Sequence, residues 1–271
     1  MEQEMIDGLQ NLGLTKEEEE GIPITTRSKS DLLEECSLSL FGRLLSNKQQ
    51  NQRALKSTLR SAWKMGSELK IYDVGNNILQ FKFSSRYQME WVESSGLWNF
   101  ENNLLLLCLW KKGLSTTNMV FTHSPFWVQL WGLPFEHMSE EMGKDVGNNL
   151  GRFVEMDKHA CQSDQALFMY IRVELSIDKL LRRGGNVVNL DGEKFWVNFK
   201  YERLPTFCFL CGKLGHDGKH CLDFPNEQNT SKQYGEWLRV GGAFKGNSGR
   251  QRSTHRDRCD EKNENITKGN G

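Results

Sequence analysis

The sequence predicts an α+β fold, in which a β-α-β-β-α-β unit packs with a second mixed α+β unit and a short Cys/His motif and a polar tail follow. Three observations predict this class. Short segments that alternate apolar and polar residues, as half-buried strands do, alternate with turn residues over residues 36–205. A few amphipathic segments with the period of an α-helix stand between them. Three cysteines and two histidines within residues 208–221 indicate a metal-binding motif after the sheets.

The first unit is expected over residues 36–112. Its predicted elements, in order, are a strand at 36–46, a helix at 47–66, strands at 69–75 and 77–84, a helix at 85–95 and a buried strand at 103–110. Gly75, Asn76 and Asn77 predict the turn between the two middle strands. This order is ferredoxin-like, an arrangement that RNA-recognition folds also use. We expect Phe81 and Phe83 to lie in its core rather than to form a stacking surface.

In the first of these helices, the expected buried side comprises Leu55, Leu59, Ala62 and Trp63, and a neighbouring basic stripe comprises Arg53, Lys56, Arg60 and Lys64. The stripe could contact phosphates or could be an ordinary solvated face. Both interpretations stay open.

The second unit is expected over residues 124–205, so that residues 36–205 form one α+β domain of two packed subdomains. Its first strand, residues 125–134, has apolar residues on one face and Trp127, Gln129 and Trp131 on the other. A helix at 139–151 begins at a capping serine and ends at a glycine. Four further strands are predicted at 152–158, 166–176, 185–192 and 193–204.

Charge is balanced overall, with 35 basic and 35 acidic residues, but it is unevenly distributed. Ten acidic and three basic residues fall within residues 1–36, and residues 1–35 are expected to be an acidic, flexible lead-in. Residues 224–271 are rich in Asn, Gly, Ser, Lys and Arg and are expected to be mostly disordered. Residues 37–271 are mildly basic, which weakly favours a polyanionic partner.

Several classes of protein are disfavoured by features that the sequence lacks. Its longest apolar run, Leu104–Trp110, has seven residues, against about 20 for a membrane span, so no membrane partner is expected. The first ten residues have neither the basic nor the apolar region of a signal peptide, so we expect an intracellular protein, in nucleus or cytoplasm, with reduced thiols. No phosphate-binding loop, HExxH motif or nucleophile elbow is present, so neither an enzyme nor a small-molecule substrate is expected.

The Cys/His motif at residues 206–223 has the spacing of a zinc site. Its four candidate ligands are Cys208, Cys211, His216 and Cys221. Three thiolates and one imidazole complete the tetrahedron that Zn²⁺ prefers, so one structural zinc ion is predicted and no position remains for a reacting water. Gly212 and Gly215 allow the short loop to fold back. His220 is an alternative ligand that would break the spacing.

Candidate nucleic-acid contacts surround this motif and one upstream turn. They are Phe209, Lys213, Lys219, Arg182 and Arg183. Phe209 could stack on an unpaired base or merely cover the zinc site. The two lysines could instead offset the negative charge of the site, and the two arginines could clamp a phosphate backbone or form a polar turn.

The motif resembles the CCHC zinc knuckles of retroviral and retrotransposon gag proteins. A larger block is similar to a plant family that joins a domain of unknown function to a CCHC knuckle, within or derived from LINE-type non-LTR retrotransposon proteins: "FWVQLWGLP", "LRRG", "FWVNFKYERLPTFCFLCGKLGH" and "YGEWLR". This resemblance covers roughly residues 36–240 and implies a gag-like role in binding nucleic acid, single-stranded RNA before DNA. Asp217 stands where retroviral knuckles often have an apolar residue, so tight capture of a specific base is not expected.

Two hypotheses follow. In the first, the α+β body presents the knuckle, and together they bind single-stranded RNA or DNA through a basic surface, Phe209 and the aromatic residues Tyr234 and Trp237. In the second, the body self-associates or binds a protein partner, and zinc only stabilises the structure at its C-terminal end. Salt dependence separates the two, because affinity for nucleic acid falls steeply with salt.

Overall fold

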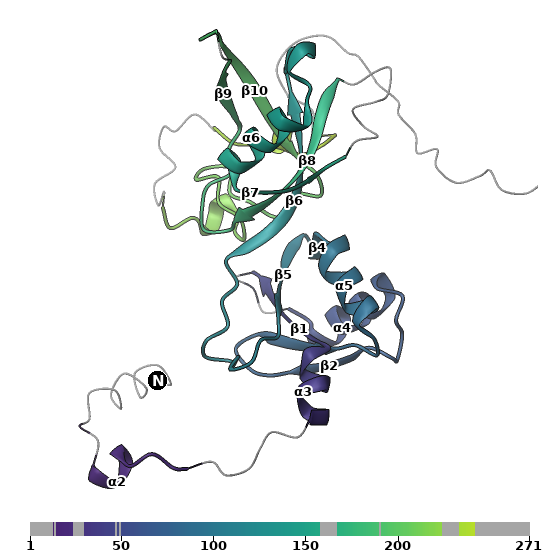
Figure 1. Ribbon diagram of the computed structural model, residues 1–271, viewed down its shortest axis with the longest axis vertical. Helices are drawn as coiled ribbons and strands as arrows, with labels where there is room; N and C mark the ends of the chain where they lie inside the picture. The colour runs from purple at the N-terminus through teal and green to yellow at the C-terminus, as the bar shows by residue number, and fades with distance from the viewer. Residues whose placement is uncertain are drawn as a thin grey trace, which may run out of the picture.

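The computed structural model describes residues 13, 15–23, 30–46, 48, 50–157, 167–189, 191–223 and 233–241. Within them the chain forms two five-stranded sheets in which every pair of neighbouring strands is antiparallel. The two units follow one another along the long axis of the molecule, and the long strand β6 (His123–Trp131) begins beside the first unit and runs into the second (Figure 1). The α+β class predicted from the sequence is confirmed.

The first unit has the predicted β-α-β-β-α-β order with one extra strand. Its elements are β1 (Ser39–Leu45), α4 (Gln52–Ala62), β2 (Lys70–Asp73), β3 (Ile78–Lys82), α5 (Arg86–Ser95), β4 (Trp98–Phe100) and β5 (Asn103–Leu109). The strand order is β2-β3-β1-β5-β4, which is the ferredoxin-like order with β4 added at the edge. The sequence analysis did not predict β4, which pairs with β5 through a turn at Glu101 and Asn102.

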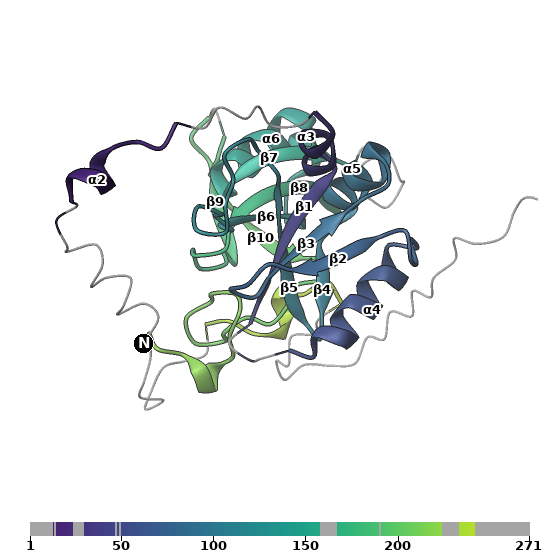
Figure 2. The same cartoon turned by 90° about the horizontal axis from the view of Figure 1, so that it is seen from below.

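Both helices of the first unit lie on the same side of its sheet (Figure 2). Asn51 caps α4 by accepting a hydrogen bond from the backbone N–H of Ala54, 3.1 Å away. Leu55, Leu59 and Trp63 are buried as expected, whereas Ala62 is exposed. The helices cover a core to which the sheet contributes Leu40, Leu79, Phe81 and Leu105, and to which Phe83, just after β3, also belongs. Phe81 and Phe83 are therefore core residues, as predicted.

The second unit repeats the strand order of the first. Its elements are β6, η1 (Phe135–His137), α6 (Glu140–Leu150), β7 (Arg152–Met156), β8 (Phe168–Ser176), β9 (Gly184–Val188) and β10 (Lys194–Tyr201). The order β7-β8-β6-β10-β9 matches β2-β3-β1-β5-β4 strand for strand. The difference is that residues 177–183, which occupy the place of α5 in the chain order, form no helix.

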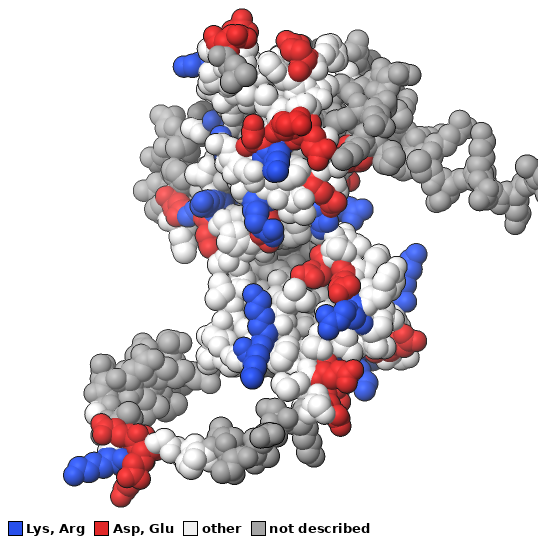
Figure 3. Space-filling model, in the orientation of Figure 1, with Lys and Arg blue, Asp and Glu red and all other residues white. Residues whose placement is uncertain are grey.

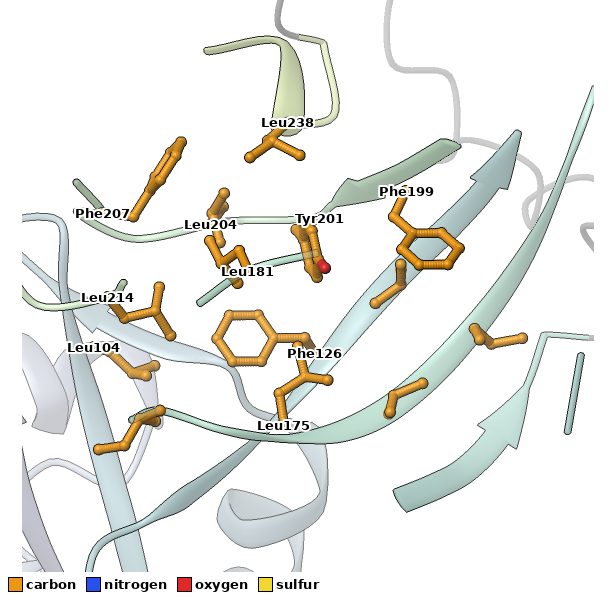
Figure 4. Close-up of a cluster of buried hydrophobic side chains, with 14 of the residues drawn as sticks. Leu104, Phe126, Leu175, Leu181, Phe199, Tyr201, Leu204, Phe207, Leu214 and Leu238 are labelled. Atoms are coloured by element: carbon orange, nitrogen blue, oxygen red, sulfur yellow. The ribbon is translucent and has the colours of Figure 1, made fainter. Parts of the chain in front are cut away.

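One helix therefore covers the second sheet, and only in part. It packs on β7 and β8, where Gly143 and Gly147 let it approach closely, because a Cβ at either position would come within 2.7 Å of Met169 or Phe153. Segments without α-helix cover the rest of that face, and η3 (Glu236–Leu238) packs on β10. They contribute the buried side chains labelled in Figure 4, namely Leu181, Leu204, Phe207, Leu214 and Leu238.

The two units share one core. The first sheet turns Phe41, Ile78, Leu104 and Leu106 away from its helices, and these side chains belong to the hydrophobic cluster of the second unit. Arg172, buried on β8, adds a hydrogen bond of 3.1 Å to the carbonyl of Gly96. The two units thus pack against each other through an apolar interface.

Two short helices precede the first sheet. They are α2 (Lys16–Glu19) and α3 (Ser30–Ser37), and Glu35 of α3 forms an ion pair of 3.1 Å with Lys82 of β3. The sequence analysis expected a flexible lead-in here and a strand from residue 36, whereas α3 continues to residue 37. The expected disordered tail lies outside the described residues except for 233–241. Among the helices described, none has the length and apolar character needed to cross a membrane.

Candidate metal centre and nucleic-acid surface

The four predicted zinc ligands come together in space. The ligand atoms of Cys208, Cys211, His216 and Cys221 all lie within 4.8 Å of one another. The three cysteines are buried and the histidine is half-buried. Three sulfur atoms and one imidazole nitrogen at this spacing match a closed tetrahedral site. The centre therefore fits one structural zinc ion.

A small hairpin brings the first two cysteines together. Phe207 and Leu214 form a β-bridge, and the Cys208 N–H donates to the carbonyl of Lys213 at 2.9 Å. Inside the turn, the N–H groups of Leu210 and Cys211 point at the Cys208 sulfur from 3.4 and 3.5 Å. These donors stabilise a thiolate, so the loop between the two cysteines is already arranged for a metal.

Two glycines make this hairpin possible, as the sequence predicted. Gly212 and Gly215 have φ angles of +78° and +88°, in the left-handed region that other residues rarely adopt. Neither position has room for a side chain, because a Cβ would meet the ring of Tyr234 at Gly212 and the side chain of Leu45 at Gly215. The knuckle is therefore held from both sides by the rest of the protein.

Burial affects the protonation of one ligand, Cys211. It raises the pKa of the Cys211 thiol well above its usual range, and the neighbouring Cys208 and Cys221 sulfurs act in the same direction. Zinc binding thus has to displace a proton from this thiol. Lys213 forms an ion pair of 2.9 Å with Asp223, which raises the pKa of the lysine and lowers that of the carboxyl group.

Asp217, the residue that departs from the gag-type pattern, has a local structural role. Its carboxylate accepts hydrogen bonds from the backbone N–H groups of Lys219 and His220, at 3.1 and 3.2 Å, and so caps η2 (Gly218–His220). It also pairs with the His220 ring at 2.6 Å. The alternative ligand His220 is thus held by Asp217 and lies outside the cluster of four.

The predicted nucleic-acid contacts near the knuckle have different environments. Phe209 is half-buried and packs against Phe207, with ring centroids 5.0 Å apart. Lys213 is occupied by its ion pair with Asp223. Lys219 is exposed on η2. Of these side chains, Lys219 is the cation that is exposed and forms no ion pair with a described residue.

The two predicted arginines point to different parts of the molecule. Arg182 donates to the side chain and the carbonyl of Asn149, at 2.6 and 3.1 Å, and lies over Phe199. Arg183 is exposed, with its guanidinium 5.8 Å from the ring centroid of Tyr234 beside the knuckle. The structure therefore separates the pair, and Arg183 is the member next to the zinc centre.

The aromatic residues after the knuckle differ from expectation. Tyr234 is buried because its ring covers Gly212, so it offers no surface for a base, and Trp237 is half-buried against the core. The sequence analysis missed Arg239, whose guanidinium lies 5.3 Å from the ring centroid of Phe207 and donates to the carbonyl of Pro205. Its only sequence signal was its place in "YGEWLR".

Charges on the surface are mixed. Figure 3 shows acidic and basic side chains interspersed over both units on the face that it presents. The stripe predicted on α4 is partly used for structure, because Arg60 donates to the carbonyl of Leu69 at 3.3 Å. A polyanion that contacts α4 would therefore meet a few separate cations rather than a continuous basic patch.

Two family models match the chain. Domain of unknown function DUF4283 matches residues 32–132, and a zinc knuckle family matches residues 176–223. The chain therefore has a DUF4283 domain followed by a CCHC zinc knuckle. The first match ends beyond β6 and the second includes β9 and β10, so both extend into the second sheet.

Among curated proteins, the uncharacterized protein At4g02000 of Arabidopsis thaliana is 27% identical over 124 residues, which are 46% of this chain and 39% of that protein. The alignment thus spans about two fifths of the length of this relative.

Solved structures similar to the chain include two proteins with RNA-binding domains. The RNA-binding domain of Hrp1 in complex with RNA is 10% identical with a TM-score of 0.24, and covers 61% of this chain and 96% of that one. The three N-terminal RNA-binding domains of the yeast splicing factor Prp24 are 11% identical with a TM-score of 0.22, and cover 50% of this chain and 53% of that one. TM-scores in this range do not establish a shared overall arrangement.

Proposed function

We propose that the protein binds single-stranded nucleic acid, RNA in preference to DNA, through its zinc knuckle. The observation that carries the proposal is the closed Cys₃His centre on a hairpin whose two glycines are fixed against the body of the protein. Zinc holds the loop, and the loop presents Phe209 and Lys219. Because protein side chains fill all four zinc positions, the proposed role is binding and not catalysis.

The cations beside the knuckle support this proposal. Lys219 and Arg183 are exposed, and each can contact a phosphate, which positions a strand without reading its sequence. The half-buried ring of Phe209 can contribute stacking on one base. Few contacts of this kind predict modest affinity and weak base preference, in agreement with the local use of Asp217.

Membership of a gag-like, retrotransposon-derived group and action inside the cell, in nucleus or cytoplasm, are further parts of the proposal. The first rests on the resemblance of the "YERLPTFCFLCGKLGH" block to LINE-type proteins. A knuckle that binds RNA without strong base preference suits packaging of a transcript.

A second candidate function is protein interaction or self-association, with zinc as a staple. One observation favours it, namely that Phe207 and Leu214 of the knuckle hairpin belong to the main hydrophobic core. In that case the metal completes the second unit and the binding partner contacts another surface.

Fluorescence anisotropy with a labelled, mixed-sequence single-stranded RNA tests the proposal over a salt series. The zinc-loaded protein is compared with a Cys208→Ser/Cys211→Ser variant and with a matched Cys36→Ser/Cys108→Ser control, whose cysteines lie outside the zinc centre. We expect the protein and the control to bind alike, with affinity that falls as salt rises, and the knuckle variant to bind at least tenfold more weakly. Absence of binding by the zinc-loaded protein at low salt would refute the proposal in favour of the second candidate.

A further inference from the structure

Strand β10 has an outward side with a distinctive chemistry. Its residues alternate, so that Phe195, Val197, Phe199 and Tyr201 face the core. The alternate positions face outward and carry, in order, Lys194, Trp196, Asn198 and Lys200. This side of the strand thus presents an aromatic ring and an amide between two cations.

Trp196 lies flat on the sheet. A Cβ built on Gly184, in the neighbouring strand β9, would come within 2.6 and 2.7 Å of two atoms of the indole ring, so the ring occupies the space above that glycine. The indole N–H donates to the side-chain carbonyl of Asn198 at 2.9 Å. With 47% of the residue exposed, the ring is supported from below and its orientation is fixed.

The side chains next to Trp196 are also held in place. Trp131 pairs with Asn198 in register and stacks on Phe168 of β8, with centroids 4.8 Å apart. The ammonium group of Lys200 lies 4.9 Å from the ring centroid of Trp131. An aromatic surface therefore continues from β10 across β6 to β8.

Several donor groups on this side make no hydrogen bond or ion pair within the described part of the chain. The NH₂ group of Asn198 makes no hydrogen bond there, although its carbonyl accepts from Trp196. Neither Lys194 nor Lys200 forms an ion pair with a described residue. The surface thus offers one amide donor and two cationic groups to a ligand.

We propose that the outward side of β10, centred on Trp196, is a stacking site for an unpaired base of single-stranded nucleic acid. This inference rests on the proposed function and adds a contact surface separate from the knuckle. The exposed face of Trp196 stacks on the base, and Asn198 donates to its edge. Lys194 and Lys200, about 20 Å apart along the strand, contact phosphates that lie a few nucleotides apart on either side of the stacked base.

Charge and shape favour a nucleic acid over a protein partner. A flat indole with a cation on each side suits a stacked base and the anionic backbone that continues from it, whereas protein interfaces usually deplete lysine and bury several apolar side chains together. A stacking contact also tolerates any base, which agrees with a protein whose knuckle shows no built site for one particular base.

The test compares Trp196→Ala with Tyr72→Ala in the zinc-loaded protein. Tyr72 is a matched control because it is 46% exposed on the other sheet, with the ammonium of Lys82 lying 5.6 Å from its ring centroid. With the same labelled RNA, we expect Trp196→Ala to weaken binding roughly tenfold and Trp196→Phe to restore most of the affinity. Tyr72→Ala should bind like the unmodified protein.

A second variant tests the cations independently of the ring. Lys194→Gln/Lys200→Gln should reduce the slope of log affinity against log salt by about 1.4, whereas Trp196→Ala should leave that slope unchanged. If the unmodified protein binds RNA and loses binding with its zinc ligands, but binds equally well without Trp196 and both lysines, this inference is wrong and the proposed function stands. If Trp196→Ala changes sedimentation of the protein instead of its RNA affinity, the surface is a protein interface and the inference also fails. If the unmodified protein does not bind at all, the proposed function itself is wrong.

Discussion

At the scale of single residues, Gly212 and Gly215 determine whether the zinc centre can form. Each has a backbone conformation that costs a side-chain-bearing residue about 1–2 kcal/mol, and each is also covered by another side chain. Tyr234, which follows the knuckle, and Leu45, at the end of β1, cover them. The geometry of the knuckle is therefore set by residues that the Cys/His spacing does not include.

We predict that Gly212→Ala lowers the zinc affinity by at least tenfold, since an alanine there is strained and also displaces the ring of Tyr234. Competition with a chromophoric chelator measures the change. The control is Gly113→Ala, which has φ of +85° and nothing within 4 Å, and which should cost stability without affecting zinc. Unchanged zinc affinity in Gly212→Ala would mean that the knuckle relaxes independently of Tyr234.

At the scale of elements, the hairpin of the zinc knuckle covers part of the second sheet, in the place where the first sheet has its second helix. The first sheet has two helices on one side, whereas the second has α6 and, over the remainder, side chains from the knuckle and from η3. Zinc thus contributes to a core that α5 completes in the first unit.

Removal of zinc by a chelator should accordingly expose residues 206–223 and 233–241 while both sheets persist. Tyr234 and Leu238 should lose protection together with the hairpin, because Tyr234 packs on Gly212. Hydrogen exchange followed by mass spectrometry measures this, with zinc restored as the control. Loss of protection in β1 and β5 as well would show that zinc stabilises the whole chain rather than this segment.

Local patterns predicted many of these elements, and long-range contacts explain what they missed. Ligand spacing predicted the zinc centre and alternation predicted the strands, because both depend on residues close in sequence. The burial of Tyr234 and the support of Trp196 by Gly184 depend on contacts between separate segments, so neither could be predicted. On β10, a lysine, a tryptophan and an asparagine at alternate positions are typical of any solvated strand face.

At the scale of the whole molecule, the two units are joined by one hydrophobic cluster. Four side chains of the first sheet pack in the core of the second unit, namely those of Phe41, Ile78, Leu104 and Leu106. A protein with a shared core is expected to unfold in a single transition, although its strand order repeats. The sequence analysis did not predict this repeat, because residues 177–183 form no helix in the place that α5 has in the first unit.

Leu106→Ala should therefore destabilise both units together, by about 2–5 kcal/mol, because a fully buried leucine is removed from their common core. Urea unfolding followed by tryptophan fluorescence and by circular dichroism should give coincident curves shifted to lower urea. Leu222→Ala, at an exposed position, is the control and should unfold like the unmodified protein. Two separate transitions would show that the units fold independently.

The contact between Leu45 of the first unit and Gly215 of the knuckle has one more consequence. The Cys/His spacing alone would describe the knuckle as a segment that can be transferred to another protein. Here the hairpin docks on β1, so grafting residues 206–223 onto another chain would leave Gly215 uncovered and Leu45 exposed. A chimera that keeps this geometry therefore has to carry β1 along with the knuckle.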